Sequence, residues 1–366
     1  MTTVFDVVFE GGGAKGIALS GAVAALEARG IGIRRFLGTS AGAITAANLA
    51  VGYTGQDILQ GSLVKTPQGK PIYTTFSDGP KDLTEAQLLD SGLGQLLGKV
   101  DLPLIPLKAE QRIDAVVLRS LDRLPGMRTV FSVMELGGMN AGDGFLDWMQ
   151  KSLEAKGTGF GTATFAELFE QTGRDLSVVA TDTTDRSQLV LNHRTAPGVP
   201  VSWGVRMSMS IPFFFVPAHW DAAWGPYLGQ DIAGHEIVDG GVVSNFPLRL
   251  FTDADTDEVI AWMGPPPDPV RILGLYLDAN LEVPGAGPGT PATHDHARLV
   301  ERIEGLVDTM MGAVDNSVLT THADLVCRLP VKGYGTTDFN VSEARVRALF
   351  NAGTAACDAY LDAHGF

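Results

Sequence analysis

A serine at position 40 lies in a context that favours nucleophilic chemistry. It is the centre of Gly38-Thr39-Ser40-Ala41-Gly42, a G-x-S-x-G pattern between an apolar run and an alanine-rich segment. Such a serine occupies a sharp strand-to-helix turn, where only small residues two positions away on either side avoid a clash. Its hydroxyl stands at the N-terminus of the next helix, which stabilises developing negative charge. The pattern predicts a nucleophile, and a serine that merely caps the helix is the alternative.

A second glycine-rich turn, Gly11-Gly12-Gly13-Ala14-Lys15-Gly16, follows the first apolar run of the chain. Unpaired backbone N–H groups at a strand-to-helix junction attract a negative oxygen, so the turn can cradle a phosphate or form an oxyanion hole. Gly11, Gly13 and Gly16 match the dinucleotide pattern G-x-G-x-x-G, but that fold needs an acidic residue at the end of its second strand. Here the second strand ends in Leu37-Gly38-Thr39-Ser40. The oxyanion hole is therefore favoured over dinucleotide binding and over a purely structural turn.

The serine also needs a base. Asp239 is an acidic residue in a turn that two glycines mark. It follows Ile237-Val238 and precedes Gly240-Gly241, which let the chain bend sharply. An α/β-hydrolase would use a histidine, but none of the seven histidines lies in such a motif. A carboxylate with an ordinary pKa near ~4 is a weak base, so burial that raises this pKa would help. An ordinary Asp-Gly turn is the alternative.

The elements that must position these groups form a βαβ unit at the start of the chain. The pattern predicts strands at residues 4–9 and 31–37, and helices at residues 14–29 and 41–51. This order implies parallel strands joined by a right-handed crossover. Both turns then lie at the carboxyl edge of one sheet, where ligands bind, and can converge on one carbonyl group.

The rest of the chain is also predicted to alternate between helices and strands. Residues 53–140 lose the regular pattern at several prolines, which predicts an insertion or cap within a single domain of residues 1–366. Further helices are predicted at 143–155, 165–172, 205–209, 299–320 and 342–363, and further strands at 176–181, 188–192, 237–238, 270–277 and 323–329. Asp182, which follows one of these strands, is expected to make a structural hydrogen bond.

Composition excludes several classes of function. The chain has 366 residues, and 45% of them are hydrophobic, which is enough for a large α/β domain. A net charge of −15 argues against nucleic acid and against electrostatic docking on an anionic membrane. Cys327 and Cys357 have neither metal-site nor disulfide-framework spacing, which favours a reducing compartment. Without a signal peptide or transmembrane segment, the sequence predicts a cytoplasmic protein that contacts a membrane surface only transiently.

Three motifs in this order resemble the patatin-like phospholipase family. They are Glu10-Gly11-Gly12-Gly13-Ala14-Lys15-Gly16, the G-x-S-x-G turn around Ser40, and Asp239-Gly240-Gly241. Two weaker features are similar to the family as well: Ser208-Met209-Ser210-Ile211-Pro212-Phe213-Phe214 and Val243-Ser244-Asn245-Phe246-Pro247. The resemblance runs from Val4 to about Pro247 and is poorest between residues 53 and 140.

The resemblance implies a three-layer α/β fold, in which a mostly parallel central sheet is flanked by helices. It implies a Ser–Asp dyad without histidine, with Ser40 as nucleophile and Asp239 as general base. Lys15 would orient the glycine loop or meet a phosphate head group, and a solvated lysine is the alternative. Neither a metal ion nor a cofactor is implied. The implied oxyanion hole consists of backbone N–H groups from the loop residues Gly11, Gly12, Gly13 and Ala14.

The activity implied is hydrolysis of lipid acyl esters, as by a phospholipase A or an esterase, through an acyl-serine intermediate. The alternatives are acyl transfer or thioester hydrolysis at the same site, or a catalytically silent protein that binds lipid and regulates. The intact Ser40 and Asp239 argue against the silent protein. A lipid or acyl-ester substrate is the implied partner, nucleic acid is not, and the oligomeric state stays open.

Overall fold

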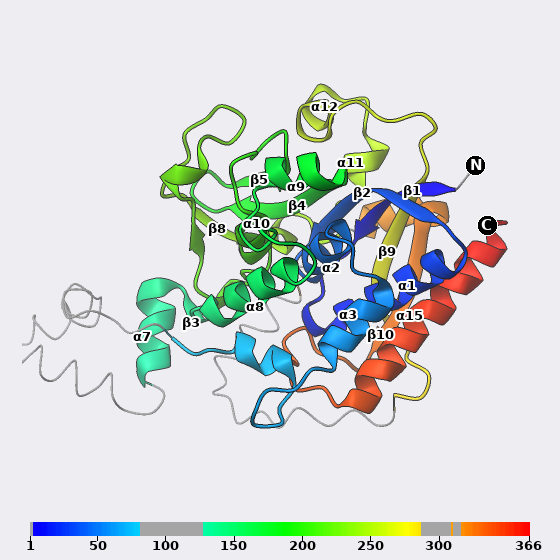
Figure 1. Cartoon of the computed structure of the whole chain (residues 1–366), viewed down its shortest axis with the longest axis horizontal. Coiled ribbons are helices and arrows are strands. Elements are labelled where there is room, and N and C mark those ends of the chain that lie inside the picture. Colours follow the sequence, from blue (N-terminus) through cyan, green and yellow to red (C-terminus); the bar gives the residue numbers. More distant parts are fainter. Residues whose placement is uncertain (1–2, 81–126, 287–308, 310–315) are drawn as a thin grey trace, which may run out of the picture.

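A central sheet organises the computed structural model, which describes residues 3–80, 127–286, 309 and 316–366 (Figure 1). The order of its strands is β10-β9-β1-β2-β4-β8-β7, with β5 paired to β4. Neighbouring strands from β10 to β4 are parallel, while β5, β7 and β8 run antiparallel to their partners. The strands are β1 (Val4–Phe9), β2 (Gly32–Thr39), β4 (Asp175–Asp182), β5 (Ser187–Leu191), β7 (Ala218–His219), β8 (Glu236–Asp239), β9 (Ile272–Glu282) and β10 (Val326–Lys332).

Helices cover both faces of the sheet, which gives the three layers expected of the fold. Side chains alternate along each strand, so Val7 and Phe9 of β1 pack into one core cluster and Val8 into the other. The first cluster contains side chains of α1 (Ile17–Ala28), α2 (Ala41–Ala50), α3 (Gly55–Ser62), α8 (Asp143–Glu154), α9 (Phe165–Thr172), α10 (Val201–Ser208) and α15 (Glu343–Ala363). The second contains side chains of α11 (Arg249–Thr252) and α12 (Asp257–Met263).

Shorter elements complete the described chain. A two-stranded sheet joins β3 (Gly138–Asn140) to β6 (Phe213–Phe215). The remaining helices are α7 (Met127–Leu136) and α14 (Asn316–Thr321), and the 3-10 turns are η1 (Gly13–Gly16), η2 (Ile72–Phe76), η3 (Ala222–Trp224), η4 (Gly240–Val242) and η5 (Ala323–Leu325). Within the described ranges, no helix combines the length and the apolar character needed to cross a bilayer.

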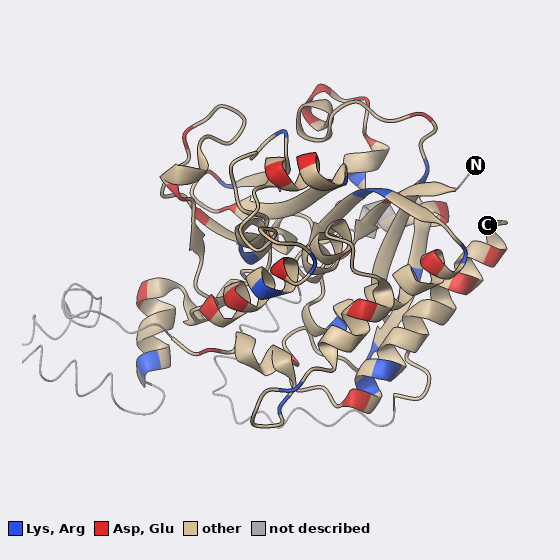
Figure 2. Cartoon of the chain, viewed as in Figure 1, with Lys and Arg blue, Asp and Glu red and all other residues tan. Residues whose placement is uncertain are grey.

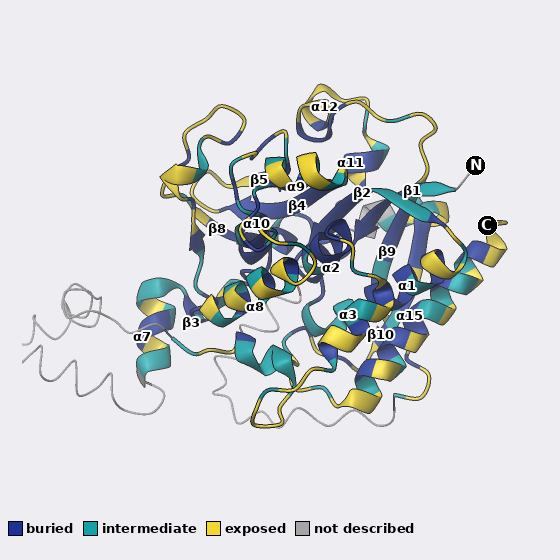
Figure 3. Cartoon of the chain, in the orientation of Figure 1, coloured by how far each residue is buried: buried dark blue, intermediate teal, exposed yellow. Residues whose placement is uncertain are grey.

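Helix α2 is buried on nearly every side. Its sequence, AGAITAANLA, holds no charge, and among its residues only Ile44 is partly exposed. A helix that is apolar all round belongs in the interior of a protein. Figure 2 shows charged residues on the outer helices and loops, and Figure 3 shows α2 and the central strands as buried. The N-terminus of α2, where Ser40 stands, is therefore inside the molecule.

The first and last helices, α1 and α15, pack against each other without room for side chains at two points (Figure 1). A Cβ added to Gly21 would lie 2.0 Å from the carbonyl oxygen of Phe350. A Cβ added to Gly353 would lie 2.1 Å from that of Ala18. Since α1 follows directly from the glycine-rich turn, α15 supports the element that carries this turn.

The predicted βαβ unit is confirmed, with β1 parallel to β2. Helix α1 begins at Ile17 because the preceding glycines form η1, and β2 extends to Thr39. Helix α10 begins at Val201, four positions before the prediction, directly after Pro200. Most of the helix predicted at 299–320 lies outside the described residues, as do residues 81–126 of the predicted insertion. The insertion at 53–140 and the single domain of residues 1–366 stay predictions.

Candidate active site

Ser40 occupies a strained turn between β2 and α2. Its φ of 52° is in the left-handed region, which residues other than glycine rarely adopt. A Cβ added to Gly38 would lie 2.4 Å from the carbonyl carbon of Gly42, and one added to Gly42 would lie 2.0 Å from the oxygen of Phe9. The two glycines of the G-x-S-x-G pattern are therefore required by backbone contacts within the turn and with β1.

The backbone of Ser40 is held by Ser208, the last residue of α10. The N–H of Ser40 donates to Ser208 Oγ over 2.9 Å. The Ser208 hydroxyl in turn donates to the carbonyl oxygen of Val179 over 2.5 Å. Ser208 thus ties the turn to the neighbouring strand β4. The sequence placed Ser208 in a family-like segment but indicated no role for it.

Ser208→Ala is expected to lower kcat by about 10–100-fold, because the nucleophile loses the bond that fixes its backbone and small misplacements are costly. The buried N–H of Ser40 would also lack an acceptor, at a cost of about 1–3 kcal/mol in unfolding free energy. Steady-state kinetics and urea unfolding measure both effects. Ser202→Ala, on the same helix, is the matched control, since its hydroxyl donates only to the Gly161 carbonyl. Equal kinetics for both variants would contradict this role.

Strand pairing places Asp239 beside the serine turn. Thr39 of β2 pairs with Val179 of β4, and the next residue, Ala180, pairs with Asp239 of β8. The Asp239 side chain is fully buried. Its Oδ1 accepts the N–H of Gly241 over 2.7 Å, and the tight bend needs Gly240, where a Cβ would lie 2.3 Å from the Val179 oxygen. The Asp-Gly-Gly sequence is thus explained by the packing of β8 on β4.

Burial raises the pKa of Asp239 to about 7, although the Gly241 N–H and the Ser40 hydroxyl both act to lower it. Desolvation is the dominant cause because a buried carboxylate loses its hydration. The Ser40 hydroxyl thus lies close enough to influence the carboxyl group, while Oδ2 lacks a well-formed hydrogen bond to any described residue. A carboxyl group with this pKa is poised to accept a proton near neutral pH.

The glycine-rich turn leaves two N–H groups free among the described residues. The N–H of Gly11 donates to the Asn245 carbonyl, and that of Ala14 to the Thr336 carbonyl, each over 3.0 Å. The N–H groups of Gly12 and Gly13 have no acceptor within the described chain. The four candidate oxyanion donors thus divide into two that are engaged within the protein and two that are available.

Two buried side chains that sequence reasoning missed fix this turn. Glu10 accepts the N–H of Leu277 through Oε2 and Nδ2 of Asn245 through Oε1, the latter over 3.2 Å. Asn245 also donates to the Gly11 carbonyl over 3.0 Å. Glu10 and Asn245 therefore clamp the start of the turn between β1, β9 and the segment after Asp239. Their only signal in the sequence was their place in the family-like motifs.

Lys15 is partly exposed, and its ammonium group has no hydrogen bond or ion pair with the described residues. It therefore does not orient the turn through such a bond. The histidines of the described chain are also separate from the dyad candidates. His235 binds Asp182 instead, with Nδ1 2.8 Å from Oδ2. Asp182 Oδ1 accepts the N–H groups of Thr184 and Asp185, which confirms its structural role.

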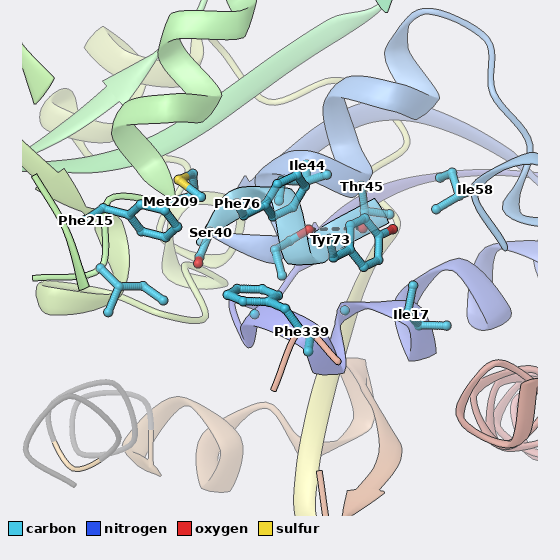
Figure 4. Close-up of a pocket in the computed structure, with 15 residues that line it drawn as sticks. Ile17, Ser40, Ile44, Thr45, Ile58, Tyr73, Phe76, Met209, Phe215 and Phe339 are labelled. Atoms are coloured by element: carbon cyan, nitrogen blue, oxygen red, sulfur yellow. Dashed lines mark hydrogen bonds between the residues drawn. The ribbon is translucent and has the colours of Figure 1, made fainter. Parts of the chain in front are cut away.

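An apolar cavity opens beside Ser40 and holds about 610 Å³ of space outside protein atoms, its mouth included. Figure 4 shows Ser40 between Met209 and Phe339, with Tyr73 and Ile58 farther from Ser40 along the lining. Among the side chains that line it, only Ser40, Thr45 and Tyr73 carry polar atoms. Thr45 is engaged with the Ala41 carbonyl over 3.1 Å. Such a lining fits a hydrocarbon chain.

Two other proteins resemble this chain in sequence. Protein YqhO of Bacillus subtilis (strain 168) is 30% identical over 363 residues, which cover 97% of each chain. The protein described as probable lipid hydrolase 463L, of Invertebrate iridescent virus 6, is 22% identical over 244 residues, covering 67% of this chain and 62% of the viral protein.

Solved structures that this chain matches include VipD from Legionella pneumophila, with a TM-score of 0.47 and 20% identity over 98% of this chain and 67% of VipD. ExoU from Pseudomonas aeruginosa, in its complex with SpcU, gives a TM-score of 0.41 and 17% identity over 99% of this chain and 53% of the matched chain. The model of the patatin-like phospholipase family matches residues 7–66 and 70–252. The chain therefore belongs to the patatin-like phospholipase family.

Proposed function

We propose that this protein is a lipid acyl hydrolase of the phospholipase A or esterase type that works through an acyl-Ser40 intermediate. The observation that carries the proposal is a buried serine on a strained turn, next to a carboxyl group whose pKa burial raises to about 7, at an apolar cavity. Membership of the family and the viral relative described as a probable lipid hydrolase support it. The substrate is a lipid or other acyl ester, reached by transient contact with a lipid surface.

In the first half of the reaction, Asp239 acts as general base. Its carboxylate takes the proton of Ser40 Oγ while Oγ attacks the ester carbonyl carbon. The carbonyl oxygen becomes an oxyanion that accepts the free N–H groups of Gly12 and Gly13. When the tetrahedral intermediate collapses, the C–O bond to the alcohol breaks and Asp239 returns the proton to the leaving oxygen. The fatty acyl group stays on Ser40 with its chain in the apolar cavity.

In the second half, water takes the place of the alcohol. Asp239 accepts a proton from water, whose oxygen attacks the acyl carbon of the Ser40 ester. Collapse of this intermediate returns the proton to Ser40 Oγ and releases the fatty acid. Lys15, which belongs to the glycine-rich turn and has no ionic partner in the described chain, would attract a phosphate of the lipid head group.

The direct test is labelling of Ser40 with an alkyl fluorophosphonate, followed by mass spectrometry and a panel of p-nitrophenyl esters and phospholipids. We expect modification of Ser40 alone, loss of hydrolysis in the labelled protein, and release of free fatty acid. Acyl transfer to added alcohols or thiols at the expense of fatty acid release would indicate an acyltransferase at the same site. If Ser40 is not labelled and no ester is hydrolysed, the protein would instead be a catalytically silent lipid-binding protein.

Gly12→Ala is expected to lower kcat by up to about 10², with little change in KM, because the oxyanion bonds form mainly in the transition state. The added Cβ would lie 2.4 Å from Cδ1 of Leu277, the end of a flexible side chain, so the fold can adjust while the turn moves. Gly13→Ala is a poorer choice, since Gly13 has a φ of 55° and its Cβ would lie 1.9 Å from the Thr336 oxygen.

Gly61→Ala is the matched control, because nothing lies within 4 Å of a Cβ at this helical position. Steady-state kinetics of the two variants should differ only in kcat. Thermal melting with and without NAD or ATP tests the alternative in which the glycine-rich turn binds the phosphates of a nucleotide. A nucleotide-dependent shift that Gly12→Ala removes, with esterase rates intact, would overturn the oxyanion assignment.

A further inference from the structure

A second cavity adjoins the one beside Ser40. It holds about 340 Å³ of space outside protein atoms, its opening to solvent included, and extends toward the N-terminal half of α15, where Val346 and Leu349 line it. Its other apolar walls are Ile17, Pro71 and Val341. Four residues line both cavities, namely Ala14, Ile17, Tyr73 and Phe339. The two spaces are therefore neighbours, and the rings of Tyr73 and Phe339 are the largest of the groups that line both.

Tyr73 is held in place from two sides. Its hydroxyl lies 2.7 Å from Ser62 Oγ, and because the Ser62 hydroxyl donates to the Ile58 carbonyl, Tyr73 is the donor in this pair. Its ring also packs against Phe76 and Trp148, with centroid distances of 5.3 and 5.8 Å. The hydroxyl bond and the ring contacts fix the ring across the end of the first cavity that is lined by Ile58 (Figure 4).

Phe339 comes from the opposite side, on the segment between β10 and α15. Its ring is 5.8 Å from that of Phe76 and 5.9 Å from that of Phe214. The same segment contacts the glycine-rich turn through the Thr336 carbonyl, which accepts the N–H of Ala14. Phe339 thus belongs to a segment that is anchored to the active site, and it lies beside Ser40 in Figure 4.

We propose that the two cavities are halves of one acyl channel, and that the rings of Tyr73 and Phe339 form the wall that limits the length of the acyl chain the enzyme accepts. The inference rests on the proposed hydrolysis at Ser40. Both cavities are lined mostly by apolar side chains. The second also contains Ser62, whose hydroxyl is already satisfied by Ile58 and Tyr73, and the exposed Asp338. A chain that ends at the wall fills the first cavity, whereas a longer chain must displace a ring.

If the two rings form such a wall, kcat/KM should pass through a maximum as the acyl chain lengthens. Each additional methylene buried in the first cavity raises kcat/KM up to about fourfold, until the chain reaches the rings. In the wild-type enzyme, octanoyl and decanoyl esters are therefore expected to exceed palmitoyl esters. Removing either ring joins the cavities. Each further methylene of a longer chain can then be buried and raise kcat/KM by the same factor.

The experiment measures kcat/KM for p-nitrophenyl esters from butanoyl to palmitoyl with the wild type, Tyr73→Ala and Phe339→Ala. The ratio of palmitoyl to octanoyl turnover is expected to rise at least about tenfold in both alanine variants. Tyr73→Phe keeps the ring and should keep the wild-type maximum. Ile44→Ala enlarges only the first cavity, which Ile44 lines without reaching the second, and should not favour palmitoyl esters. If Tyr73→Ala does not fold, the ratio measured with Phe339→Ala alone tests the wall.

Binding separates this inference from the proposed function. Calorimetric titration of octanoate and palmitate into Ser40→Ala, with and without Phe339→Ala, needs no turnover. A gain in palmitate affinity on removing the ring supports the channel even if no ester is hydrolysed. Hydrolysis by the wild type with an unchanged chain-length maximum in both alanine variants would overturn the wall and leave the hydrolase intact.

Discussion

Ser40→Ala is expected to reduce kcat/KM for every ester by about 10⁴–10⁶, because the acyl-enzyme route is lost and only binding and oxyanion stabilisation remain. The fold should persist, since alanine keeps the small volume that the turn between Gly38 and Gly42 permits. Fluorophosphonate labelling should disappear together with activity. Release of p-nitrophenol under initial-rate conditions measures the loss.

Ser20→Ala is the matched control for this variant. Ser20 is also fully buried, but its hydroxyl donates only within α1, to the Ile17 carbonyl over 2.8 Å. If Ser20→Ala hydrolyses esters at near the wild-type rate while Ser40→Ala is inactive, the nucleophile is assigned to position 40. Substantial turnover by well-folded Ser40→Ala would instead refute a serine nucleophile at this turn.

Asp239→Asn is expected to reduce kcat by about 10³–10⁴, because the amide keeps the shape and can still accept the Gly241 N–H but cannot take a proton. In the wild type, kcat/KM should rise with pH through about 7, where the base ionises. Asp182→Asn, a neutralised carboxyl group on the neighbouring strand, and His235→Ala should both retain activity. A histidine variant as inactive as Ser40→Ala, yet folded, would require a triad in place of the dyad.

The same variant should change how stability depends on pH. Folded Asp239 keeps its proton up to about pH 7, whereas an unfolded aspartate releases it near its ordinary value of 3.8. Raising the pH through this window therefore favours unfolding of the wild type by about 1.4 kcal/mol per pH unit, on the order of 4 kcal/mol in all. The amide introduced by Asp239→Asn does not titrate, so the free energy of unfolding of this variant does not decrease for this reason as the pH rises.

Urea unfolding at pH 5 and pH 8 measures this effect. The free energy of unfolding of Asp239→Asn, relative to the wild type, should increase by roughly 3 kcal/mol between these two values. A buried amide without an acceptor costs about 1–3 kcal/mol at both pH values, so the change with pH is the decisive quantity. A difference that is independent of pH would contradict the buried, proton-retaining carboxyl group.

The candidate catalytic motifs could be located from the sequence because they depend on local geometry. Gly38 and Gly42 are required within a single turn, and Asp239-Gly240-Gly241 within another, so both turns leave a compact signature. Strands β1, β2 and β4 each contain a short apolar run, Val7-Val8-Phe9, Phe36-Leu37 and Val178-Val179-Ala180, which marks them as buried. The resemblance to the family added the pairing of Ser40 with Asp239, which no local pattern could supply.

The groups that support the site were missed because they act over long sequence separations. Ser208 supports Ser40, Asn245 binds Glu10, and Thr336 accepts from the glycine-rich turn, and none of these pairs is local in sequence. Their side chains or carbonyls carry no distinctive pattern of their own. The second cavity and its aromatic wall likewise arise only when residues 71–76 and 338–349 are brought together.

Short elements were missed for a different reason. Strands β3, β6 and β7 have only two or three residues, which is too few for a period to emerge. Helix α12 spans seven residues and is marked chiefly by its cap, where Thr256 accepts the N–H of Val259. Such elements depend on tertiary packing rather than on intrinsic propensity.

The order of the sheet has a consequence for biosynthesis. Strand β1, which leads into the oxyanion turn, is flanked by β9, and the turn itself is fixed by the carbonyl of Thr336. Both partners are translated long after β1, and contacts so distant in sequence form late in folding. A ribosome-bound nascent chain thus holds Ser40 and Asp239 without a finished oxyanion turn. The proposed hydrolase would remain harmless to nearby membranes until its synthesis has passed Thr336.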